Sequence, residues 1–162
     1  MIDPTMEERA RAVLARCRAA KRMVVTVESC TGGLLAAALT AIAGSSDVVE
    51  RGFVTYTNDA KTELVGVPAS FLERVGAVSE EVARAMAAGG LAHARADIAV
   101  AITGIAGPGG ATALKPVGLV HIAAARRDGT VVHERHVFPG DRASVRRASV
   151  LAALALIERL AG

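Results

Sequence analysis

Aromatic residues and cysteines are scarce in this sequence. Its 162 residues include three phenylalanines, one tyrosine and no tryptophan. So few rings exclude the interleaved stacking platform on which many proteins bind single-stranded nucleic acid. The two cysteines, Cys17 and Cys30, fit neither a disulfide framework nor a metal-ligand spacing, so we expect two reduced thiols.

The sequence also lacks a long apolar run and a concentrated block of charge. Its longest apolar runs, such as residues 117–125, are shorter than the roughly 18 to 20 residues that a membrane span needs. The chain does not begin with a charged segment followed by an apolar one, as a secretion signal would. The net charge is only +3, and the basic residues are spread from Arg9 to Arg159. We therefore expect a cytoplasmic protein with neither a membrane nor a nucleic-acid partner.

Small aliphatic residues make up most of the chain. Hydrophobic residues account for 52% of it and aromatic residues for only 2%, so the core must consist of alanine, valine, leucine and isoleucine, as in layered α/β proteins. A chain of 162 residues is long enough for one compact core and short for two. We expect a single domain over residues 1–162, without internal repeats or linkers.

Apolar periodicity and turn residues predict about five strands and five or six helices. Strands are predicted at residues 23–27, 52–57, 97–103, 117–126 and 130–138. Helices are predicted at residues 5–20, 33–43, 59–65, 79–95 and 141–160, with a short helical turn opened by Pro68. Their expected N-caps are Thr5, Asn58, Ser79 and Asp141. Because strands and helices alternate until a hairpin turn at Asp128 and Gly129, we expect a three-layer α/β/α sandwich with a mixed, mostly parallel sheet.

The first candidate site is the segment VESCTGG at residues 27–33, which joins a predicted strand to a predicted helix. Free N–H groups at a helix N-terminus can bind a phosphate or a developing oxyanion, and the glycine pair lets a ligand approach the main chain. Ser29 at this junction is a candidate nucleophile, in a geometry like that of a nucleophile elbow. Taken alone, the segment fits a plain helix cap by Ser29 or Thr31 better, because such caps are common. Cys30 is an alternative nucleophile or a packed thiol.

The second candidate site is VTYTNDAK at residues 54–61, which carries Tyr56 and Lys61. Lys61 falls in the first turn of a predicted helix, where the positive end of the helix dipole disfavours an ammonium ion and lowers the lysine pKa. A neutral lysine can act as the base that a serine nucleophile requires. The alternative is a solvated surface lysine, and Tyr56 can orient the pair, orient the substrate or simply fill a pocket.

Two further segments are candidates for holding an anion. The loop at residues 103–118 follows a predicted strand and is rich in glycine, but it lacks the GxGxxG spacing. The segment GDR at residues 140–142 places Arg142 at a capped helix start. The histidines do not predict a metal site, because His133 and His136 point to opposite faces of a strand and His121 has no ligand-spaced neighbour.

Together, these segments resemble the CinA C-terminal-domain family. The resemblance rests on the motifs ESCTGG, GFVTYTNDAK, GAVSEEVA, TGIAGPGG, KPVG and GDR in the order that the family has them, from about Val25 to the final helix. It implies an amidohydrolase that converts nicotinamide mononucleotide and water into nicotinic acid mononucleotide and ammonia. It also implies a stand-alone copy, without the long N-terminal domain of many relatives, that needs no metal or organic cofactor.

The resemblance assigns roles to particular residues. It implies Ser29 as the nucleophile, Lys61 as its base and Tyr56 as a third catalytic residue. The implied substrate-binding residues are Glu28, Cys30, Thr31, Gly32, Gly33, Thr103, Gly104, Gly107 and Arg142. The oxyanion would be held by N–H groups around residues 30–33. The chain departs from the family pattern at Thr57, Asp59, Ala111 and Leu114.

Two other functions stay open at this point. One is a nucleotide-binding module that keeps the pocket without turnover. The other, suggested by the family's historical name, is a competence or DNA-damage factor. The family also leads us to expect a homo-oligomer, either a dimer or a larger assembly, while the preferred pyridine carboxamide is not set by the sequence.

Overall fold

A five-stranded sheet forms the centre of the computed structural model, which describes residues 2–162. Its strands are β1 (Val24–Glu28), β2 (Val49–Val54), β3 (Ile98–Gly104), β4 (Leu119–Arg126) and β5 (Val131–Val137). They lie in the order β2-β1-β3-β4-β5. β1 pairs in parallel with β2 and β3, whereas β4 is antiparallel to both β3 and β5. The sheet is therefore mixed, and β4 alone runs against the other four strands.

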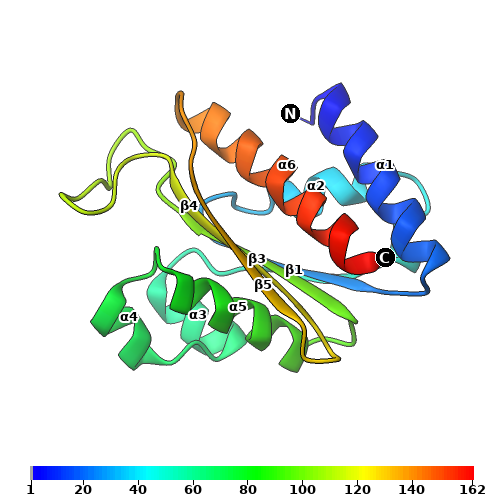
Figure 1. Ribbon diagram of the computed structural model, residues 1–162, viewed down its shortest axis with the longest axis horizontal. Coiled ribbons are helices and arrows are strands. Elements are labelled where there is room, and N and C mark those ends of the chain that lie inside the picture. The colour runs from blue at the N-terminus through cyan, green and yellow to red at the C-terminus, as the bar shows by residue number, and fades with distance from the viewer. Residues whose placement is uncertain (1) are drawn as a thin grey trace.

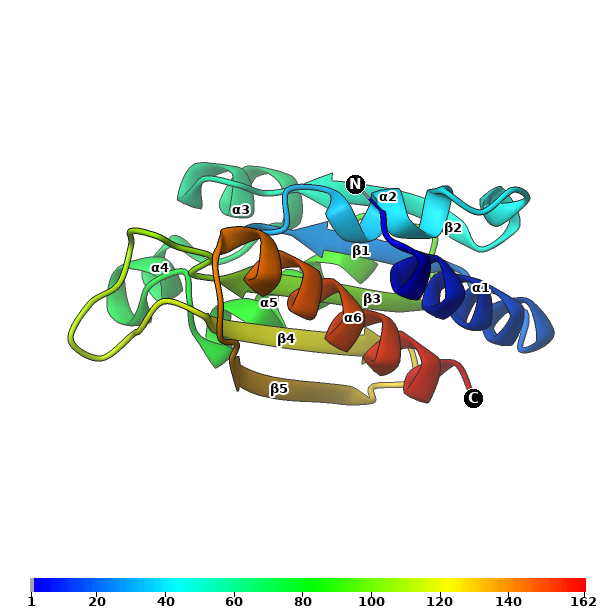
Figure 2. The same cartoon turned by 90° about the horizontal axis from the view of Figure 1, so that it is seen from above.

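Helices cover both faces of this sheet (Figure 1). One face carries α1 (Pro4–Ala19), α2 (Leu34–Thr40) and α6 (Arg142–Ala161), and the other carries α3 (Asn58–Val65), α4 (Ala69–Val75) and α5 (Glu80–Ala92). A short 3-10 helix, Ser45–Asp47, precedes β2. Seen from above, α1, α2 and α6 lie across the strands of the sheet (Figure 2). The predicted three-layer α/β/α sandwich with a terminal hairpin is confirmed.

The two faces of β3 enter two separate cores, as the alternation of side chains along a strand requires. Ile98, Val100 and Ile102 pack toward α1, α2 and α6, while Ala99 and Ala101 pack toward α5. The small side chains let α5 lie very close to the sheet: a Cβ atom on Gly90 would be 2.7 Å from a methyl carbon of Val27. This close approach explains how a chain with so few aromatic rings fills its interior.

The first helix begins earlier than predicted, and Thr5 is not its cap. Asp3 is the N-cap, with an extended backbone, and its carboxylate accepts the Met6 N–H at 3.0 Å. Pro4 follows as the first helical residue, a position that suits proline because no intrahelical acceptor awaits its missing N–H. The predicted cap at Thr5 is therefore wrong, and the helix is capped two residues upstream by Asp3.

The structure also moves the second strand and the cap of the helix after it. Thr57, and not the predicted Asn58, caps α3 by accepting the Ala60 N–H at 3.1 Å. β2 occupies Val49–Val54 in place of the predicted 52–57. Its first residues include the charged pair Glu50–Arg51. This pair interrupts the apolar pattern by which strands are predicted, so the start of this edge strand was missed. The predicted caps Ser79 and Asp141 are confirmed at the starts of α5 and α6.

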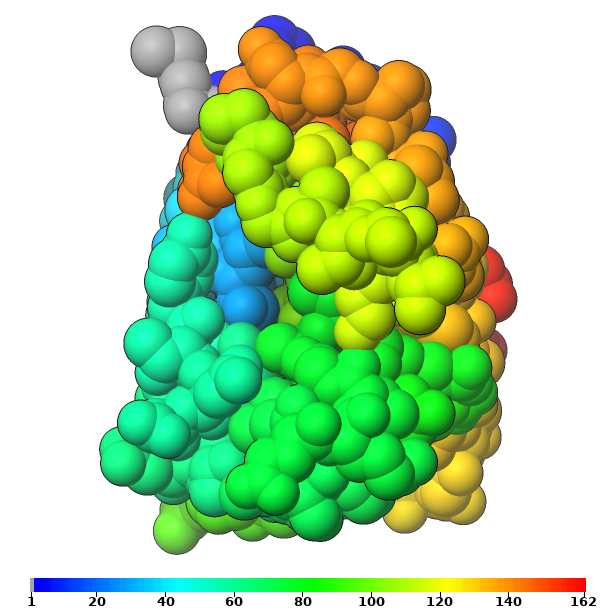
Figure 3. All heavy atoms as spheres, turned by 90° about the vertical axis from the view of Figure 1, so that its left-hand side faces the viewer, coloured from blue at the N-terminus to red at the C-terminus, as the bar shows by residue number. Residues whose placement is uncertain are grey.

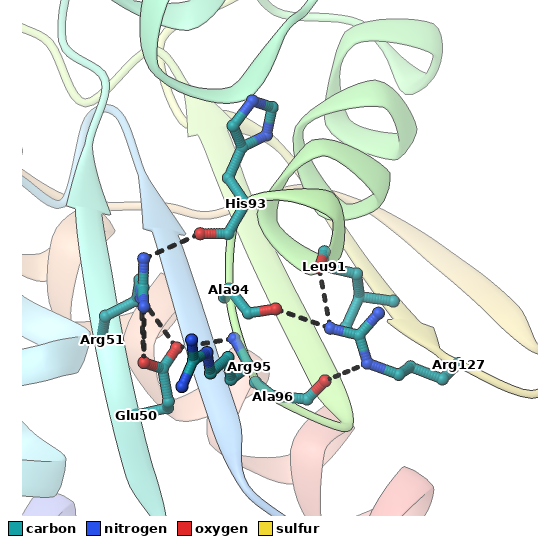
Figure 4. Close-up of polar contacts among 8 residues, drawn as sticks. All are labelled: Glu50, Arg51, Leu91, His93, Ala94, Arg95, Ala96 and Arg127. Atoms are coloured by element: carbon teal, nitrogen blue, oxygen red, sulfur yellow. Dashed lines mark hydrogen bonds and ion pairs between the residues drawn. The ribbon is translucent and has the colours of Figure 1, made fainter.

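At the end of α5, an arginine from the β-hairpin binds the helix carbonyls (Figure 4). The Arg127 guanidinium donates to the carbonyls of Leu91, Ala94 and Ala96 at 2.8, 2.6 and 2.6 Å. Cations are favoured at helix C-termini, where carbonyl groups lack intrahelical partners. This contact fixes the connection into β3 at the amino end of the strand, away from the edge described next.

Candidate active site

The carboxyl ends of four strands meet at one edge of the sheet. β1, β2 and β3 are parallel, and β5 runs in the same direction, so the segments that follow them share this edge. The chain leaves β1 toward β2 on one side and returns to β3 on the other, which makes the end of β1 the point where the strand order reverses. Ligands in open α/β sheets bind at such a point. Ser29 is the residue directly after β1.

Ser29 and Lys61 meet at this edge. The Lys61 Nζ lies 3.0 Å from the Ser29 Oγ, although the two residues come from different layers of the sandwich. Nζ also donates to the Thr55 carbonyl at 2.9 Å and lies 3.5 Å from the Thr57 carbonyl. A neutral amine has two N–H bonds and one lone pair. The two carbonyls can accept these two N–H bonds, which leaves the lone pair directed at the serine hydroxyl.

Burial shifts the pKa of this lysine. Lys61 is 1% exposed, and within residues 2–162 no carboxylate forms an ion pair with it. Removal from water disfavours the charged ammonium, so burial lowers the pKa of Lys61 below its ordinary value, while the nearby Cys30 acts weakly in the opposite direction. The shift favours the free amine, which is the form that accepts a proton.

The turn after β1 leaves N–H groups available. We call residues Ser29–Gly33 the nucleophile turn. Within it, the Gly32 N–H donates to the Ser29 carbonyl at 3.0 Å. The N–H groups of Cys30 and Thr31 donate to no acceptor within residues 2–162. Free N–H groups beside a serine hydroxyl can stabilise an oxyanion on the carbon that the hydroxyl attacks.

The Cys30 thiol is a poor competitor for the role of nucleophile. Cys30 is 7% exposed, and burial raises the pKa of its thiol to about 11. The reactive form of cysteine is the thiolate, which is scarce near neutral pH at such a pKa. Of the two adjacent candidates, only Ser29 has its side chain within hydrogen-bond distance of a lysine amine among residues 2–162.

A cavity of about 280 Å³ opens beside the serine. Figure 3 looks onto this edge of the sheet, where the loop between β3 and β4 borders a hollow with part of the first third of the chain, in blue, at its base. Of the residues expected to act on or bind the substrate, eight line the cavity: Ser29, Cys30, Tyr56, Lys61, Thr103, Gly104, Gly107 and, from the start of α6, Arg142. Within residues 2–162 the lining contains the Arg142 guanidinium, the Lys61 amine and no carboxylate, so the cavity suits an anionic ligand.

Arg142 ties three parts of the cavity together. Its guanidinium donates to the Gly107 carbonyl at 2.8 Å and to the Tyr56 hydroxyl at 2.9 Å. Thr103 is held from the opposite wall, where its hydroxyl donates to the Ala77 carbonyl at 2.8 Å. The segment after β2, the end of β3 with the loop after it, the start of α6 and the segment before α5 are thus held around one space.

Four residues expected to bind substrate lie behind the cavity and not in its lining: Glu28, Thr31, Gly32 and Gly33. Glu28 is fully buried, and its carboxylate accepts the N–H groups of Leu35 and Ala36 at 2.9 and 3.1 Å. It therefore substitutes for the N-cap side chain that Gly33 cannot supply to α2. In the structure, Glu28 therefore supports the start of α2, directly after the nucleophile turn.

The lining also includes residues that the sequence did not single out as site residues. Ala77 and Val78 come from the segment GAVSEEVA, and Asn58 follows the cap of α3. GAVSEEVA is one of the motifs that carry the family resemblance, and this was the sequence signal that could have pointed to Ala77 and Val78. Apolar residues in a turn carry no chemical signature of their own, so only the fold places them against Ser29.

Two histidines of neighbouring strands lie together without forming a metal site among residues 2–162. Within residues 2–162, no group of three or more histidine, cysteine or carboxylate side chains could hold a metal ion. His121 and His133, which the spacing had left apart, contact each other with 2.8 Å between ring nitrogens, because their strands are neighbours. No helix in the same range is long and apolar enough to span a membrane.

The fold and the site define an α/β protein with a buried serine–lysine pair at the carboxyl edge of its sheet. The chain belongs to the CinA family, since the model of the CinA C-terminal domain matches residues 6–161. The resemblance seen in its motifs is thereby confirmed.

Relatives of known name or structure support this membership. A CinA-like protein of Mycolicibacterium gilvum is 55% identical over 140 residues, which are 86% of this chain and 33% of that protein. The nicotinamide-nucleotide amidohydrolase PncC of Enterobacter agglomerans is 56% identical over 123 residues, 76% of this chain and 75% of the relative. The crystal structure of competence/damage inducible protein CihA from Agrobacterium tumefaciens matches with a TM-score of 0.97 at 50% identity, covering 100% of this chain and 99% of that one. The chain spans about a third of the length of the first curated relatives that it matches.

Proposed function

We propose that this chain hydrolyses the carboxamide of nicotinamide mononucleotide through a covalent acyl-enzyme on Ser29. The observation that carries the proposal is a lysine that is 1% exposed, has no carboxylate partner within residues 2–162 and lies 3.0 Å from the serine hydroxyl. The name of the Enterobacter agglomerans relative, nicotinamide-nucleotide amidohydrolase, supports the same substrate class. A nucleotide monophosphate also suits a cavity whose lining within residues 2–162 includes the Arg142 guanidinium and no carboxylate.

Acylation begins when the neutral Lys61 amine accepts the proton of the Ser29 hydroxyl. The Oγ forms a bond to the carboxamide carbon, and the carbonyl oxygen becomes an oxyanion near the free N–H groups of Cys30 and Thr31. The Lys61 ammonium then gives its proton to the nitrogen as the C–N bond breaks, and ammonia leaves. The amine is neutral again at the end of this step.

Deacylation repeats these proton transfers with water as the nucleophile. Lys61 accepts a proton from water, the hydroxide adds to the acyl carbon, and the Ser29 oxygen leaves as it regains that proton. The product is nicotinic acid mononucleotide. Arg142 and the loop at residues 104–110 supply the positive charge and N–H groups for the phosphate, and Tyr56 with Thr103 borders the pyridine ring.

The test is ammonia release from nicotinamide mononucleotide by the wild type and by Ser29→Ala and Lys61→Ala. We expect Ser29→Ala to be inactive and Lys61→Ala to lose at least about 100-fold in kcat, as the removal of a general base does. Ser149→Ala is the matched control, because Ser149 is a buried serine whose hydroxyl bonds only within α6. Mass spectrometry of the quenched reaction should find the nicotinoyl group on Ser29.

Two results would contradict the proposal. Full turnover in Ser29→Ala or Lys61→Ala would remove the serine–lysine mechanism. Binding of the nucleotide by calorimetry without ammonia release in the wild type would identify a binding module in place of an enzyme.

A further inference from the structure

Two arginines one helical turn apart on α6 contact the active-site region, Arg142 in the cavity lining and Arg146 outside it. Arg142 contacts Gly107 and Tyr56 in the cavity, as described above. Arg146, at i+4 on the same face of the helix, lies outside the lining, and its Nη2 donates to the Thr31 carbonyl at 2.9 Å. The next residue, Arg147, turns away and pairs with Asp3. Only Arg146 of the three therefore bonds to the nucleophile turn.

The contact of Arg146 fixes one peptide unit. The Thr31 carbonyl belongs to the same peptide plane as the Gly32 N–H, and this N–H donates to the Ser29 carbonyl at 3.0 Å. Gly32 has a φ of +57°, and a Cβ atom at this position would be 3.8 Å from Arg146 Nη2, so the guanidinium lies against the turn. If this peptide flipped, the turn would lose the bond to Ser29 and would direct its N–H groups elsewhere.

The remaining donors at this helix end are already used. The Leu34 N–H donates to Thr31, and Glu28 binds the N–H groups of the next two residues. With Arg146 holding the carbonyl side, the turn is held between a buried carboxylate and a guanidinium. Within residues 2–162, the N–H groups of Cys30, Thr31 and Gly33 remain without an acceptor.

Stability alone does not account for this use of an arginine. The Arg146 Nε is buried and has no acceptor within residues 2–162. A buried donor without a partner destabilises a fold, so a smaller or apolar side chain would suit the packing better. The guanidinium also brings positive charge beside the turn on which an oxyanion would form.

We propose that Arg146 is a positioning residue that holds the Thr31–Gly32 peptide in place and thereby aims the free N–H groups of the nucleophile turn at the oxyanion. This inference rests on the proposed hydrolase, but it concerns the turn and not the identity of the substrate. Arg146 itself contacts neither the substrate cavity nor the serine hydroxyl.

The first test follows the reaction of Ser29 with a fluorophosphonate, which forms a phosphonyl-serine by loss of fluoride and needs no nucleotide. We expect Arg146→Met to slow this labelling about 10- to 100-fold, the effect of a small misplacement of reacting groups. Arg147→Met, one residue along and paired with Asp3, should label at the wild-type rate. Added guanidinium at millimolar concentration should restore part of the rate in Arg146→Ala, a response that a purely structural defect would not give.

The second test compares steady-state constants for ammonia release. Arg146→Met should lower kcat by a similar factor and leave KM within about threefold, because the lost stabilisation belongs to the transition state. Arg146→Lys should keep part of the activity, since it retains the charge and one donor. Thermal unfolding of each variant checks that the fold is intact.

Each outcome has one interpretation. Labelling and kcat at the wild-type level in Arg146→Met, or a rise in KM alone, would overturn the positioning role. The same holds for a wild type whose Ser29 does not react with the fluorophosphonate. A wild type that labels rapidly but releases no ammonia would contradict the proposed function alone.

Discussion

Replacement of Lys61 by methionine should change how the stability of the protein depends on pH. In the folded chain, burial lowers the pKa of Lys61, whereas the unfolded chain exposes it to water at its ordinary value of 10.5. Between the two values the unfolded state carries one more proton than the folded state, so the free energy of unfolding rises with pH in this window. The burial of the lysine therefore destabilises the fold by its full amount below the lowered pKa. This destabilisation disappears as the pH approaches 10.5. Lys61→Met lacks the titration.

The size of the effect follows from one proton. The difference in unfolding free energy, wild type minus Lys61→Met, should rise by up to about 1.36 kcal/mol per pH unit inside the window. Urea unfolding of both proteins at intervals from pH 7 to pH 10.5 measures it, and the subtraction cancels groups that the two chains share. A difference that is flat over this range would mean that the fold does not shift the lysine pKa. A difference that falls with pH would mean that the fold stabilises the ammonium, and either result would refute a neutral base.

Three further changes test other parts of the structure. Cys30 should react slowly with iodoacetamide at pH 8, because its thiol pKa is raised to about 11, and rapid alkylation of the native protein, located by mass spectrometry, would contradict this. Gly89→Ala should destabilise the protein despite the higher helix propensity of alanine, since its Cβ would be 1.8 Å from the Val65 carbonyl oxygen; a raised melting temperature would refute the close packing. Arg127→Ala should lower the free energy of unfolding by about 2 kcal/mol in urea titrations and leave kcat unchanged, and a loss of kcat in a folded variant would link the far end of α5 to catalysis.

Most of the fold could be predicted from local sequence signals. The hairpin at Asp128 and Gly129, the caps Ser79 and Asp141, and the alternation of strands and helices depend on residues close together in the chain. The errors arose where two neighbours could perform the same role. Thr57 and Asn58 are both good caps, and the backbone selects Thr57, whose carbonyl accepts the Lys61 N–H in the first turn of α3.

The site could be predicted less completely, because its contacts are distant in sequence. Ser29 and Lys61 are 32 positions apart, and only the pairing of β1 with β2 brings their segments together. The support of Thr31 by Arg146 spans 115 positions. No spacing rule covers such a contact, and an arginine on a helix is usually solvated. The resemblance placed Glu28 among the substrate-binding residues, but its carboxylate binds the N–H groups of Leu35 and Ala36 at the start of α2.

In the proposed mechanism, a neutral Lys61 depends on the completed fold. Ser29 lies at the end of β1 and Lys61 comes from α3 beyond β2, and the backbone bond from the Thr55 N–H to the Glu28 carbonyl, 2.8 Å long, joins the two segments just before they reach the site. The Thr55 carbonyl in turn accepts from Lys61 Nζ. If this pairing opened, water would enter, the lysine pKa would return toward its ordinary value, and the base would become an ammonium ion. If Lys61 is the base of the proposed mechanism, the contacts that assemble the pair also favour its deprotonated form, and a locally opened molecule would lack an activated serine.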